Sequence, residues 1–434
     1  FCNCWSLTLT SPILPESLTT MKGRVFHNDH SIKELVFPAG LSEIAEETCW
    51  NCHALERVVI SEGTTKIGTS AFKATHALTE ASITLPSTMK VIGAAAFENA
   101  GITSLSFLPD GVETIEGYAF MGCPIKDKVI TLPSITSIGY YAFENNKTIG
   151  AIYISGSHDV VLDDIFGKAS NCLIYAAGKV TLPTNEHIYN KITNGTCLKL
   201  RLIEDSPWYC PEPFNVGIVT LTKQFNQDYY NTNYPVYAVS GKASNWYAFN
   251  MPFVPDEITS ADGRTWAPFN ADVEGAKPFW LRKLTTDTKK PFVDVTEIEA
   301  DVPYIISFPC NENYDAEYNL CGDITFTATN ITIPKTGDQI VLSGPYYSMF
   351  SSYEPIPQAS SVYLLNSAHY EPNGVRKDYN DVWGSAFEQS LRESWAWEPY
   401  ISFSSPTTTR TISLDGASTR GHKEVGSIPS IDDM

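Results

Sequence analysis

Large apolar residues return at a nearly constant interval along the first part of the chain. A phenylalanine recurs every 23 to 25 residues, and a cysteine stands where one is missing. We call this position the Phe slot, and its members are Phe1, Phe26, Cys49, Phe72, Phe97, Phe120, Phe143 and Phe166. Self-similarity at a period of this size is typical of solenoids, in which each repeat packs mainly on its neighbours.

Each repeat has the pattern of a short strand followed by a turn. Segments 35–37, 58–60 and 152–154 are rich in β-branched and aromatic residues, which favours strands. A proline follows many of these apolar runs, and because it cannot donate to a strand ladder it ends the pairing. We therefore expect the strands of successive coils to stack in parallel.

A glycine often precedes the Phe slot by four residues, as at Gly68, Gly93 and Gly139. Glycine adopts backbone conformations that are closed to other residues, so the pattern predicts an unusual backbone angle at this point of the coil. The large residue of the Phe slot then enters the core beneath the next coil.

Beyond about residue 200 the period ends, and Pro207, Pro211 and Pro213 indicate a stiff junction. The segments that follow are short, apolar and separated by turn residues, and they are predicted as strands: 214–225, 246–249, 303–308, 324–333, 340–342, 361–365, 400–403 and 409–414. Residues 387–395 suggest a helix. Many short strands with such turns favour an all-β sandwich or barrel.

The predicted fold is therefore mostly β. A right-handed solenoid of parallel strands, with repeats of about 23 residues, is expected over residues 1–200, where the last part is a degenerate cap. A Pro-rich junction at 201–213, an all-β, sandwich-like domain at 214–416 and a polar tail at 417–434 are expected to follow. Because residues 1–7 fall inside a repeat and do not resemble a signal peptide, we expect a fragment or a processed form.

The repeats resemble those of the BspA-type leucine-rich repeat family of bacterial surface proteins. The motifs that carry the resemblance are Ile-Gly-Thr-Ser-Ala-Phe at 67–72, Ile-Gly-Ala-Ala-Ala-Phe at 92–97 and Ile-Gly-Tyr-Tyr-Ala-Phe at 138–143. The resemblance covers about residues 1–170 and implies an extracellular or outer cell-surface location and an adhesion-type role.

The second half resembles, less specifically, the β domain that closes repeat-bearing surface proteins of Bacteroides-like bacteria. This resemblance rests on the segments 194–196, 213–214, 220–225, 251–253 and 301–306. It implies that the second half is a β domain of this kind.

Composition narrows the classes of partner. The 30 basic and 49 acidic residues give a formal charge of −19, which disfavours nucleic acid and anionic lipid surfaces. No run of 18 apolar residues is present, so no transmembrane segment is expected in this chain. The ten cysteines allow disulfides, for example Cys197–Cys210 or Cys310–Cys321, but equally allow free thiols.

Residue groups that could carry chemistry fit the repeat better than they fit a site. Cys49 and Cys52 lie on the repeat frame, and no second pair or histidine spacing completes a tetrahedral metal site. Glu297, Glu299 and Asp301 alternate and would form a solvated face of a strand. The nucleophile-elbow, phosphate-loop and dinucleotide motifs are absent, so we expect no cofactor, no metal and no catalytic residues.

Outward strand positions and aromatic residues are the candidates for binding. On the solenoid, Glu56, Arg57 and Tyr153 are predicted to point outward. Seven of the nine tryptophans follow residue 200, and Trp395 and Trp397 would share a face of an extended segment.

The predicted function is non-catalytic binding, with adhesion to a host extracellular matrix protein, a mucin or a glycan. The alternative is a structural stalk or envelope scaffold without a ligand of its own. A hydrolase in the β domain is a remote alternative, because it needs two opposed carboxylates that the sequence does not identify.

Overall fold

The fold was analysed in a computed structural model of the chain. The structure describes residues 10–181, 190–204, 206–225, 246–309, 317–318, 320, 322–365, 386–390, 393–403 and 411–413. The chain divides into two compact units, of which the first comprises residues 1–198 and 209–211 and the second comprises residues 199–208 and 212–434. The polar tail predicted at 417–434 lies outside the described residues, as do Cys310 and Cys321.

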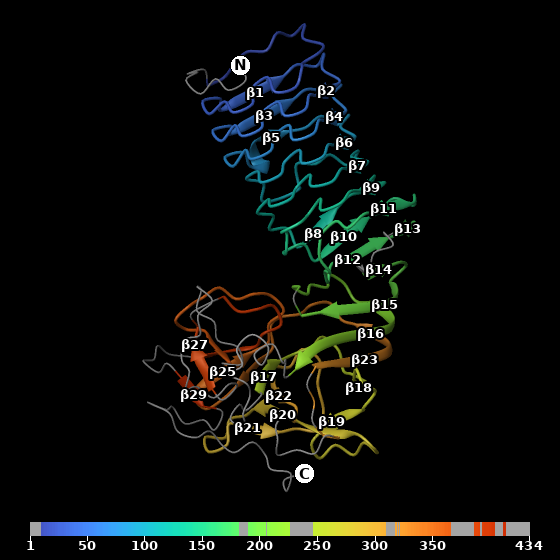
Figure 1. Cartoon of the computed structure of the whole chain (residues 1–434), viewed down its shortest axis with the longest axis vertical. Coiled ribbons are helices and arrows are strands. Elements are labelled where there is room, and N and C mark those ends of the chain that lie inside the picture. Colours follow the sequence, from blue (N-terminus) through green and yellow to red (C-terminus); the bar gives the residue numbers. More distant parts are fainter. Residues whose placement is uncertain are drawn as a thin grey trace. The chain divides into compact units, whose positions relative to one another are not determined.

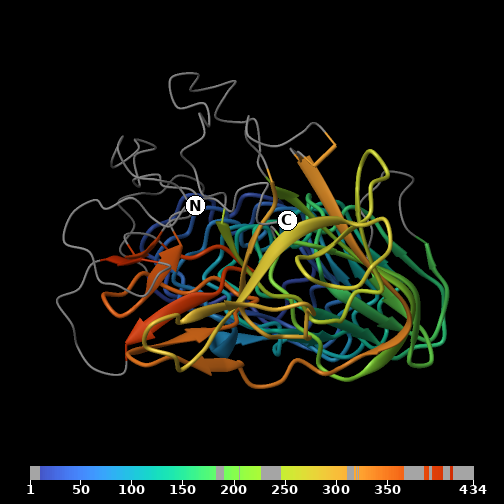
Figure 2. The ribbon, with the colours of Figure 1, turned by 90° about the horizontal axis from the view of Figure 1, so that it is seen from below.

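The first unit is a solenoid of parallel strands, as the sequence predicts (Figure 1). A seven-stranded sheet follows one side of the coils: β2 (Glu43–Ile44), β4 (Lys66–Ile67), β6 (Val91–Ile92), β7 (Thr114–Ile115), β9 (Ser137–Ile138), β11 (Val160–Leu162) and β13 (Val180–Thr181). Every neighbouring pair in this sheet is parallel. In the perpendicular view the blue-to-green coils overlap one another, as coils stacked along one axis must (Figure 2).

Two shorter parallel sheets contain the strands that the sequence predicts at the start of each repeat. The first consists of β1 (Glu34–Phe37), β3 (Arg57–Ile60) and β5 (Ile83–Thr84). The second consists of β8 (Val129–Thr131), β10 (Ala151–Ile154), β12 (Leu173–Ala176) and β14 (Asn190–Ile192). The predicted strands at 35–37, 58–60 and 152–154 are thus confirmed. Among the described residues the one helical element is a short 3-10 helix, η1 (Glu80–Ser82).

The Phe slot forms the centre of the solenoid core. Its members from Phe26 to Phe166, with Cys49 in the missing place, are all buried. The rings of Phe72, Phe97, Phe120 and Phe143 stack in a column, with centroids 5.5, 5.5 and 5.9 Å apart and planes within 15° of parallel. Each coil therefore completes the apolar environment of the next, and none buries its large side chain alone.

The glycines before the Phe slot are required by close packing, which corrects the prediction of an unusual backbone angle. Gly68, Gly93 and Gly139 are not among the residues with positive φ. A Cβ atom on Gly93 would instead lie 2.4 Å from the carbonyl oxygen of Ile67 in the preceding coil, and one on Gly68 would lie 2.6 Å from that of Ile44. The backbones of adjacent coils approach so closely here that a methyl group does not fit.

Positive φ angles occur instead two residues before and two residues after the Phe slot. The first position is occupied by Arg24, Glu47, Ser70, Ala95, Tyr118 and Tyr141. The second is occupied by Asn28, Asn51, Ala74, Asn99, Gly122 and Asn145, and asparagine tolerates this conformation better than most residues. Two left-handed residues per coil therefore shape the turn that carries the Phe slot.

The second unit consists of antiparallel and mixed sheets. One contains β15 (Thr196–Ile203), β16 (Phe214–Phe225), β23 (Gly322–Ile333) and β18 (Glu257–Ser260). Another contains β17 (Trp246–Phe249), β22 (Tyr304–Ser307), β20 (Lys277–Leu284) and β19 (Trp266–Pro268), with β21 (Phe292–Asp294) beside β20. The third contains β24 (Val341–Ser343), β25 (Tyr347–Phe350), β28 (Tyr400–Phe403), β26 (Tyr363–Leu365), β27 (Ala386–Gln389) and β29 (Thr411–Ser413).

The helix predicted at 387–395 is wrong, because residues 386–389 form strand β27. Phe387 pairs with Leu365 of β26 and is fully buried in a core cluster that includes Trp246, Tyr347 and Ile401. Burial of one aromatic side chain against a sheet decides the conformation here, over the weak local preference for a helix.

Candidate functional site

Glu56 and Arg57 lie on the strand side of the solenoid, where both side chains are exposed. Glu56 accepts a hydrogen bond from Lys33 of the preceding coil at 3.0 Å, and Arg57 forms an ion pair with Glu34 of that coil. The two pairs are adjacent. The basic residue belongs to the preceding coil in the first pair and to the following coil in the second. Both predicted residues are therefore exposed, but each is already engaged by a neighbour within the solenoid.

The same inter-coil pairing recurs on other faces of the solenoid. Arg24–Glu47, Lys73–Glu98 and Lys90–Glu113 are ion pairs of 2.7, 2.7 and 2.8 Å, each joining adjacent coils. The hydrogen bond from Arg24 holds the pKa of Glu47 below its usual value. The exposed pair Lys90–Glu113 contributes little to stability, but all three pairs hold side chains of adjacent coils against one another.

Tyr153 is half-buried on β10 and stacks on Tyr175 of β12. The ring centroids are 4.4 Å apart and the planes differ by 4°. Because β10 and β12 are parallel and in register at these residues, the stack is a direct consequence of the repeat. One face of the Tyr153 ring is thus covered by Tyr175, and the side chain keeps only part of its surface exposed.

Trp395 and Trp397 lie in different environments, so they do not form the common exposed face that an extended segment would give. Trp395 is 49% exposed, whereas Trp397 is 2% exposed. The indole Nε1 of Trp397 donates a hydrogen bond to the carbonyl oxygen of Ser206 at 2.7 Å, and its ring contacts Tyr353 edge-on at 4.9 Å. Trp397 has a φ of 66°, which breaks the strand geometry that the prediction assumed.

A cluster of three tyrosines on the turns of two adjacent coils was missed by the sequence reasoning. Tyr140 and Tyr141 stack with centroids 3.6 Å apart, and Tyr118 of the preceding coil meets them edge-on at 5.8 and 5.6 Å. We call Tyr118, Tyr140 and Tyr141 the tyrosine cluster. Its signal was present in the motif at 138–143, where two tyrosines occupy places that carry alanines at 94–95.

Histidines also form a column, on the turns of the first coils. The imidazole centroids of His30, His53 and His76 are successively 5.1 Å apart, and all three side chains are exposed. In a neighbouring column, Trp50 lies between His27, which stacks on it, and Lys73, whose ammonium group lies 5.3 Å from the ring centroid.

The cysteines of the Cys-x-x-Cys pair are structural. Cys49 and Cys52 are fully buried, and burial raises the pKa of Cys49 well above its ordinary value. The thiol of Cys52 donates to the carbonyl oxygen of Phe26 at 2.9 Å, and Cys123 and Asn146 donate in the same way to Phe97 and Phe120. In these three coils, the residue three places after the Phe slot thus satisfies a carbonyl group of the preceding coil.

The acidic segment at 297–301 is not a strand, which corrects the expectation of a uniform solvated face. Glu299 pairs with Lys283 at 2.6 Å. Asp301 is partly buried, has a φ of 63° and accepts a hydrogen bond of 2.5 Å from the hydroxyl of Tyr353. Burial raises the pKa of Asp301 above its ordinary value.

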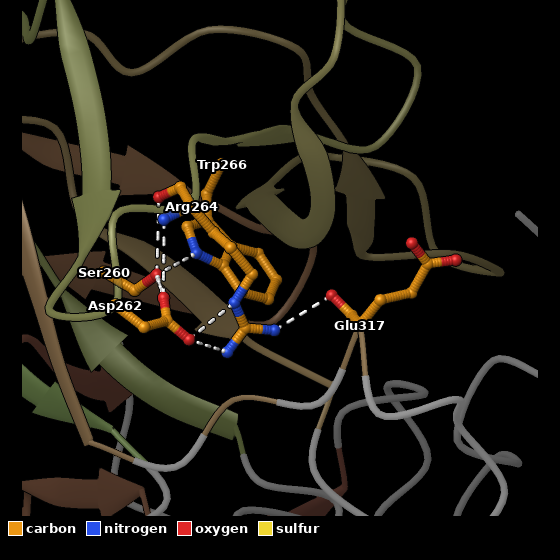
Figure 3. A network of polar contacts seen from close by, with 5 residues as sticks. All are labelled: Ser260, Asp262, Arg264, Trp266 and Glu317. Atoms are coloured by element: carbon orange, nitrogen blue, oxygen red, sulfur yellow. Dashed lines mark hydrogen bonds and ion pairs between the residues drawn. The ribbon is translucent and has the colours of Figure 1, made fainter.

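A network of polar contacts in the second unit closes the turn between β18 and β19 (Figure 3). Asp262 accepts hydrogen bonds from Ser260 at 2.6 Å and from Nε of Arg264 at 2.8 Å, and these bonds hold its pKa far below the usual value. Arg264 also donates to the carbonyl oxygen of Glu317, and the buried Trp266 donates to Ser260. A carboxylate engaged in this way stabilises a turn and is a poor proton carrier.

Two general findings bear on function. Within the part of the chain that the structure describes, no group of three or more histidine, cysteine, aspartate or glutamate residues is placed to hold a metal ion. Across the same described residues, no helix has the length and apolar character needed to cross a membrane.

Comparison with known proteins identifies the repeats. A family model described as a BspA-type leucine-rich repeat region matches six copies, over residues 1–123 and 80–193. A search of curated protein sequences gave no significant match.

Two solved structures show limited similarity. A leucine-rich repeat protein from Bacteroides ovatus is 20% identical, with a TM-score of 0.31, and the alignment covers 42% of this chain and 52% of that protein. A leucine-rich cell surface protein from Faecalibacterium prausnitzii is 15% identical, with a TM-score of 0.26, and the alignment covers 45% and 76%. The chain thus spans about half the length of the first of these proteins. By the match to the family model, residues 1–193 carry repeats of the BspA type.

Proposed function

We propose that this chain is a non-catalytic binding protein, located at the cell surface or outside the cell, and that its solenoid contacts a host matrix protein, a mucin or a glycan. The observation that carries the proposal is the fixed order of exposed side chains along the coils. Glu56 and Arg57 are held by inter-coil ion pairs, and Tyr153 is held by a ring stack. Side chains that are already ordered lose little entropy on binding, which favours a large partner.

A structural stalk is the second candidate, and the inter-coil ion pairs favour it. Five such pairs neutralise charges within the solenoid, so those charges need no outside partner. A stalk needs only this internal pairing, whereas a binding surface needs residues that gain contacts from the partner.

A solid-phase binding screen separates the two candidates. The purified full chain is tested against matrix proteins, mucins and a glycan array, with a high-salt wash. The test variants are Glu56→Ala with Arg57→Ala, Tyr153→Ala and Trp395→Ala. Matched controls are Glu43→Ala, which is exposed on the other side of the coils, and Tyr346→Ala, which is 62% exposed in the second unit.

Saturable, salt-resistant binding that the solenoid variants weaken and the controls retain would support the proposal. Loss in Trp395→Ala alone would move the site to the second unit, and binding to none of these ligand classes would favour the stalk. The ion-paired residues are suitable targets because exposed pairs contribute at most about 1 kcal/mol to folding, so these variants should remain folded.

A further inference from the structure

The tyrosine cluster is anchored on one side and exposed on the other. A Cβ atom on Gly167 would lie 2.8 Å from Cε1 of Tyr141, so the ring of Tyr141 is enclosed between the backbone of Gly167 and the ring of Tyr140. Tyr118 and Tyr140 remain 38% and 39% exposed. The cluster therefore offers two accessible rings held in place by a third.

The rings lie between a coil with alanines at the equivalent positions and a coil with aspartates there. In the preceding coil, Ala94 and Ala95 occupy the positions equivalent to Gly117 and Tyr118, and Ala95 is bonded through its backbone to Gly117. Because alanines are small, they leave the side of Tyr118 open.

In the next coil, two carboxylates occupy the positions of Tyr140 and Tyr141. The backbone N–H of Tyr141 donates to the carbonyl oxygen of Asp164 at 2.7 Å. The side chain of Asp163 is exposed, whereas that of Asp164 is buried and accepts a hydrogen bond from the backbone N–H of Gly167 at 3.1 Å. The charge of Asp164 is close enough to contribute to the raised pKa of Tyr140, which is about 12 and is caused mainly by the hydrogen bond with Tyr141. Tyr140 thus stays neutral at physiological pH, beside negative charge and within a chain of net charge −19.

We infer that the tyrosine cluster, with the exposed carboxylate of Asp163, binds arginine side chains of a basic segment in a partner protein; this inference rests on the proposed binding function. The faces of neutral tyrosine rings attract cations, and carboxylates beside them add charge complementarity. Arginine fits better than lysine because its planar guanidinium stacks on an aromatic ring and pairs with a carboxylate through two hydrogen bonds.

The geometry disfavours a sugar ring at this position. Stacking of a pyranose needs one broad, accessible ring face. Here the plane of Tyr118 is inclined by 76° and 80° to those of Tyr140 and Tyr141, and the close stack of Tyr140 on Tyr141 uses one face of each. A guanidinium group is smaller than a pyranose and can stack on the exposed part of one ring, whereas a pyranose needs a whole ring face.

The test compares two peptides of equal charge on the full chain. The probes are fluorescein-labelled octapeptides of alternating arginine and glycine, and of alternating lysine and glycine. Their affinities are measured by fluorescence anisotropy at 0.15 M salt, a condition at which exposed charges more than about 8 Å apart are largely screened. We expect the arginine peptide to bind about two- to fivefold more tightly, because lysine lacks the planar stacking and the two-bond carboxylate pairing of the guanidinium group, and an exposed contact of this kind is worth about that factor.

The variants separate stacking from charge. Tyr118→Ala with Tyr140→Ala should abolish the preference for arginine while leaving a weak, salt-sensitive attraction to both peptides. Tyr118→Phe with Tyr140→Phe keeps the rings and should keep the preference, which shows that the rings and not the hydroxyl groups carry it. An unchanged circular dichroism spectrum and thermal unfolding midpoint of the double alanine variant exclude misfolding as the cause of its loss. The control Tyr346→Ala removes an exposed tyrosine of the second unit and should leave the preference unchanged.

Equal affinity for the two peptides, or a preference that survives in the double alanine variant, would overturn the inference. Binding of a neutral oligosaccharide that this variant loses would also overturn it, because the cluster would then be a glycan site within the same proposed function. A preference for arginine that depends on the cluster, together with no partner in the macromolecular screen, would support the cluster assignment and count against the proposed function.

Discussion

The short distance between neighbouring coils explains why glycine occupies certain positions of the repeat. The backbone N–H of Gly93 donates to the carbonyl oxygen of Ile67 at 2.9 Å, and the space for a Cβ atom is taken by that same oxygen. Sequence reasoning identified the position but assigned the wrong cause, because one sequence shows that a residue is small and does not show what it touches.

We expect Gly93→Ala to lower the free energy of unfolding by about 1–3 kcal/mol, since the methyl group must displace backbone atoms of the preceding coil. Gly337→Ala is the matched control, because no atom lies within 4 Å of the added Cβ atom, and its effect should stay within about 0.5 kcal/mol. Urea denaturation followed by circular dichroism measures both values. Equal effects of the two substitutions would contradict the close-packing explanation.

Asp301 should make stability depend on pH. Burial raises its pKa in the folded state, so the folded protein binds the proton more tightly than the unfolded chain does. The contribution of Asp301 to the stability of the folded protein is therefore complete below the pKa of the unfolded chain, about 3.9. It is lost as the pH rises through the pKa of the folded state. Asp301→Asn, which can still accept the hydrogen bond of Tyr353, should gain stability relative to the parent protein as the pH rises from acid to neutral.

The measurement is the difference in thermal unfolding midpoint between the variant and the parent protein at several pH values. Tyr353→Phe is the companion variant: its lost hydrogen bond normally lowers the pKa of Asp301, so its pH dependence should become steeper. A difference between Asp301→Asn and the parent protein that does not change with pH would show that Asp301 titrates alike in both states.

At the scale of elements, the coils were predictable because every repeat needs a strand with one buried face, and this pattern recurs many times. Strands β1, β3 and β10 fall at the predicted segments, since a strand with alternating burial must recur wherever the period recurs. In the second unit, β16 (Phe214–Phe225) and β17 (Trp246–Phe249) also have the predicted bounds. The prediction failed at β27, which lies outside the repeats, because its conformation depends on burial of Phe387 and on pairing with β26 and β29, and neither can be read from the local sequence.

The stacked rings of the Phe slot should make the solenoid sensitive to loss of one member. Phe97 contacts Phe72 and Phe120 in the column and meets Phe107 edge-on at 5.7 Å. Phe97→Ala should therefore lower the free energy of unfolding by about 3–5 kcal/mol, the usual effect of a cavity of this size. Phe97→Leu, which refills part of the space, should cost clearly less. Denaturant titration of both variants tests this, and equal losses would contradict a tightly packed column.

At the scale of the whole molecule, the candidate site was only partly predictable. Local periodicity placed Glu56, Arg57 and Tyr153 on the outside, but it could not show that Trp397 donates to Ser206, which is 191 residues away. The tyrosine cluster joins side chains of two coils, and its ring geometry depends on the spacing between coils. Contacts of this kind follow from the folded chain and not from the spacing of residues within one repeat.

The net charge of −19 gives a prediction that belongs to the whole chain. A field of this sign repels polyanions and accelerates the approach of cations, more strongly as the salt concentration falls. We expect no binding of heparin or duplex DNA at 0.15 M salt, and an association rate for the alternating arginine peptide that rises about tenfold or more when the salt concentration is lowered toward 0.01 M, because the screening length increases from about 8 to about 30 Å.

Stopped-flow fluorescence measures the association rate of the arginine peptide, and a gel-shift assay measures the binding of heparin and DNA. The variant with Tyr118→Ala and Tyr140→Ala keeps the net charge, so its association rate should show the same salt dependence even where its complex dissociates faster. Retention of heparin or DNA at 0.15 M salt would mean that a local basic surface outweighs the overall charge. An association rate that does not respond to salt would mean that long-range attraction does not govern the encounter with basic partners.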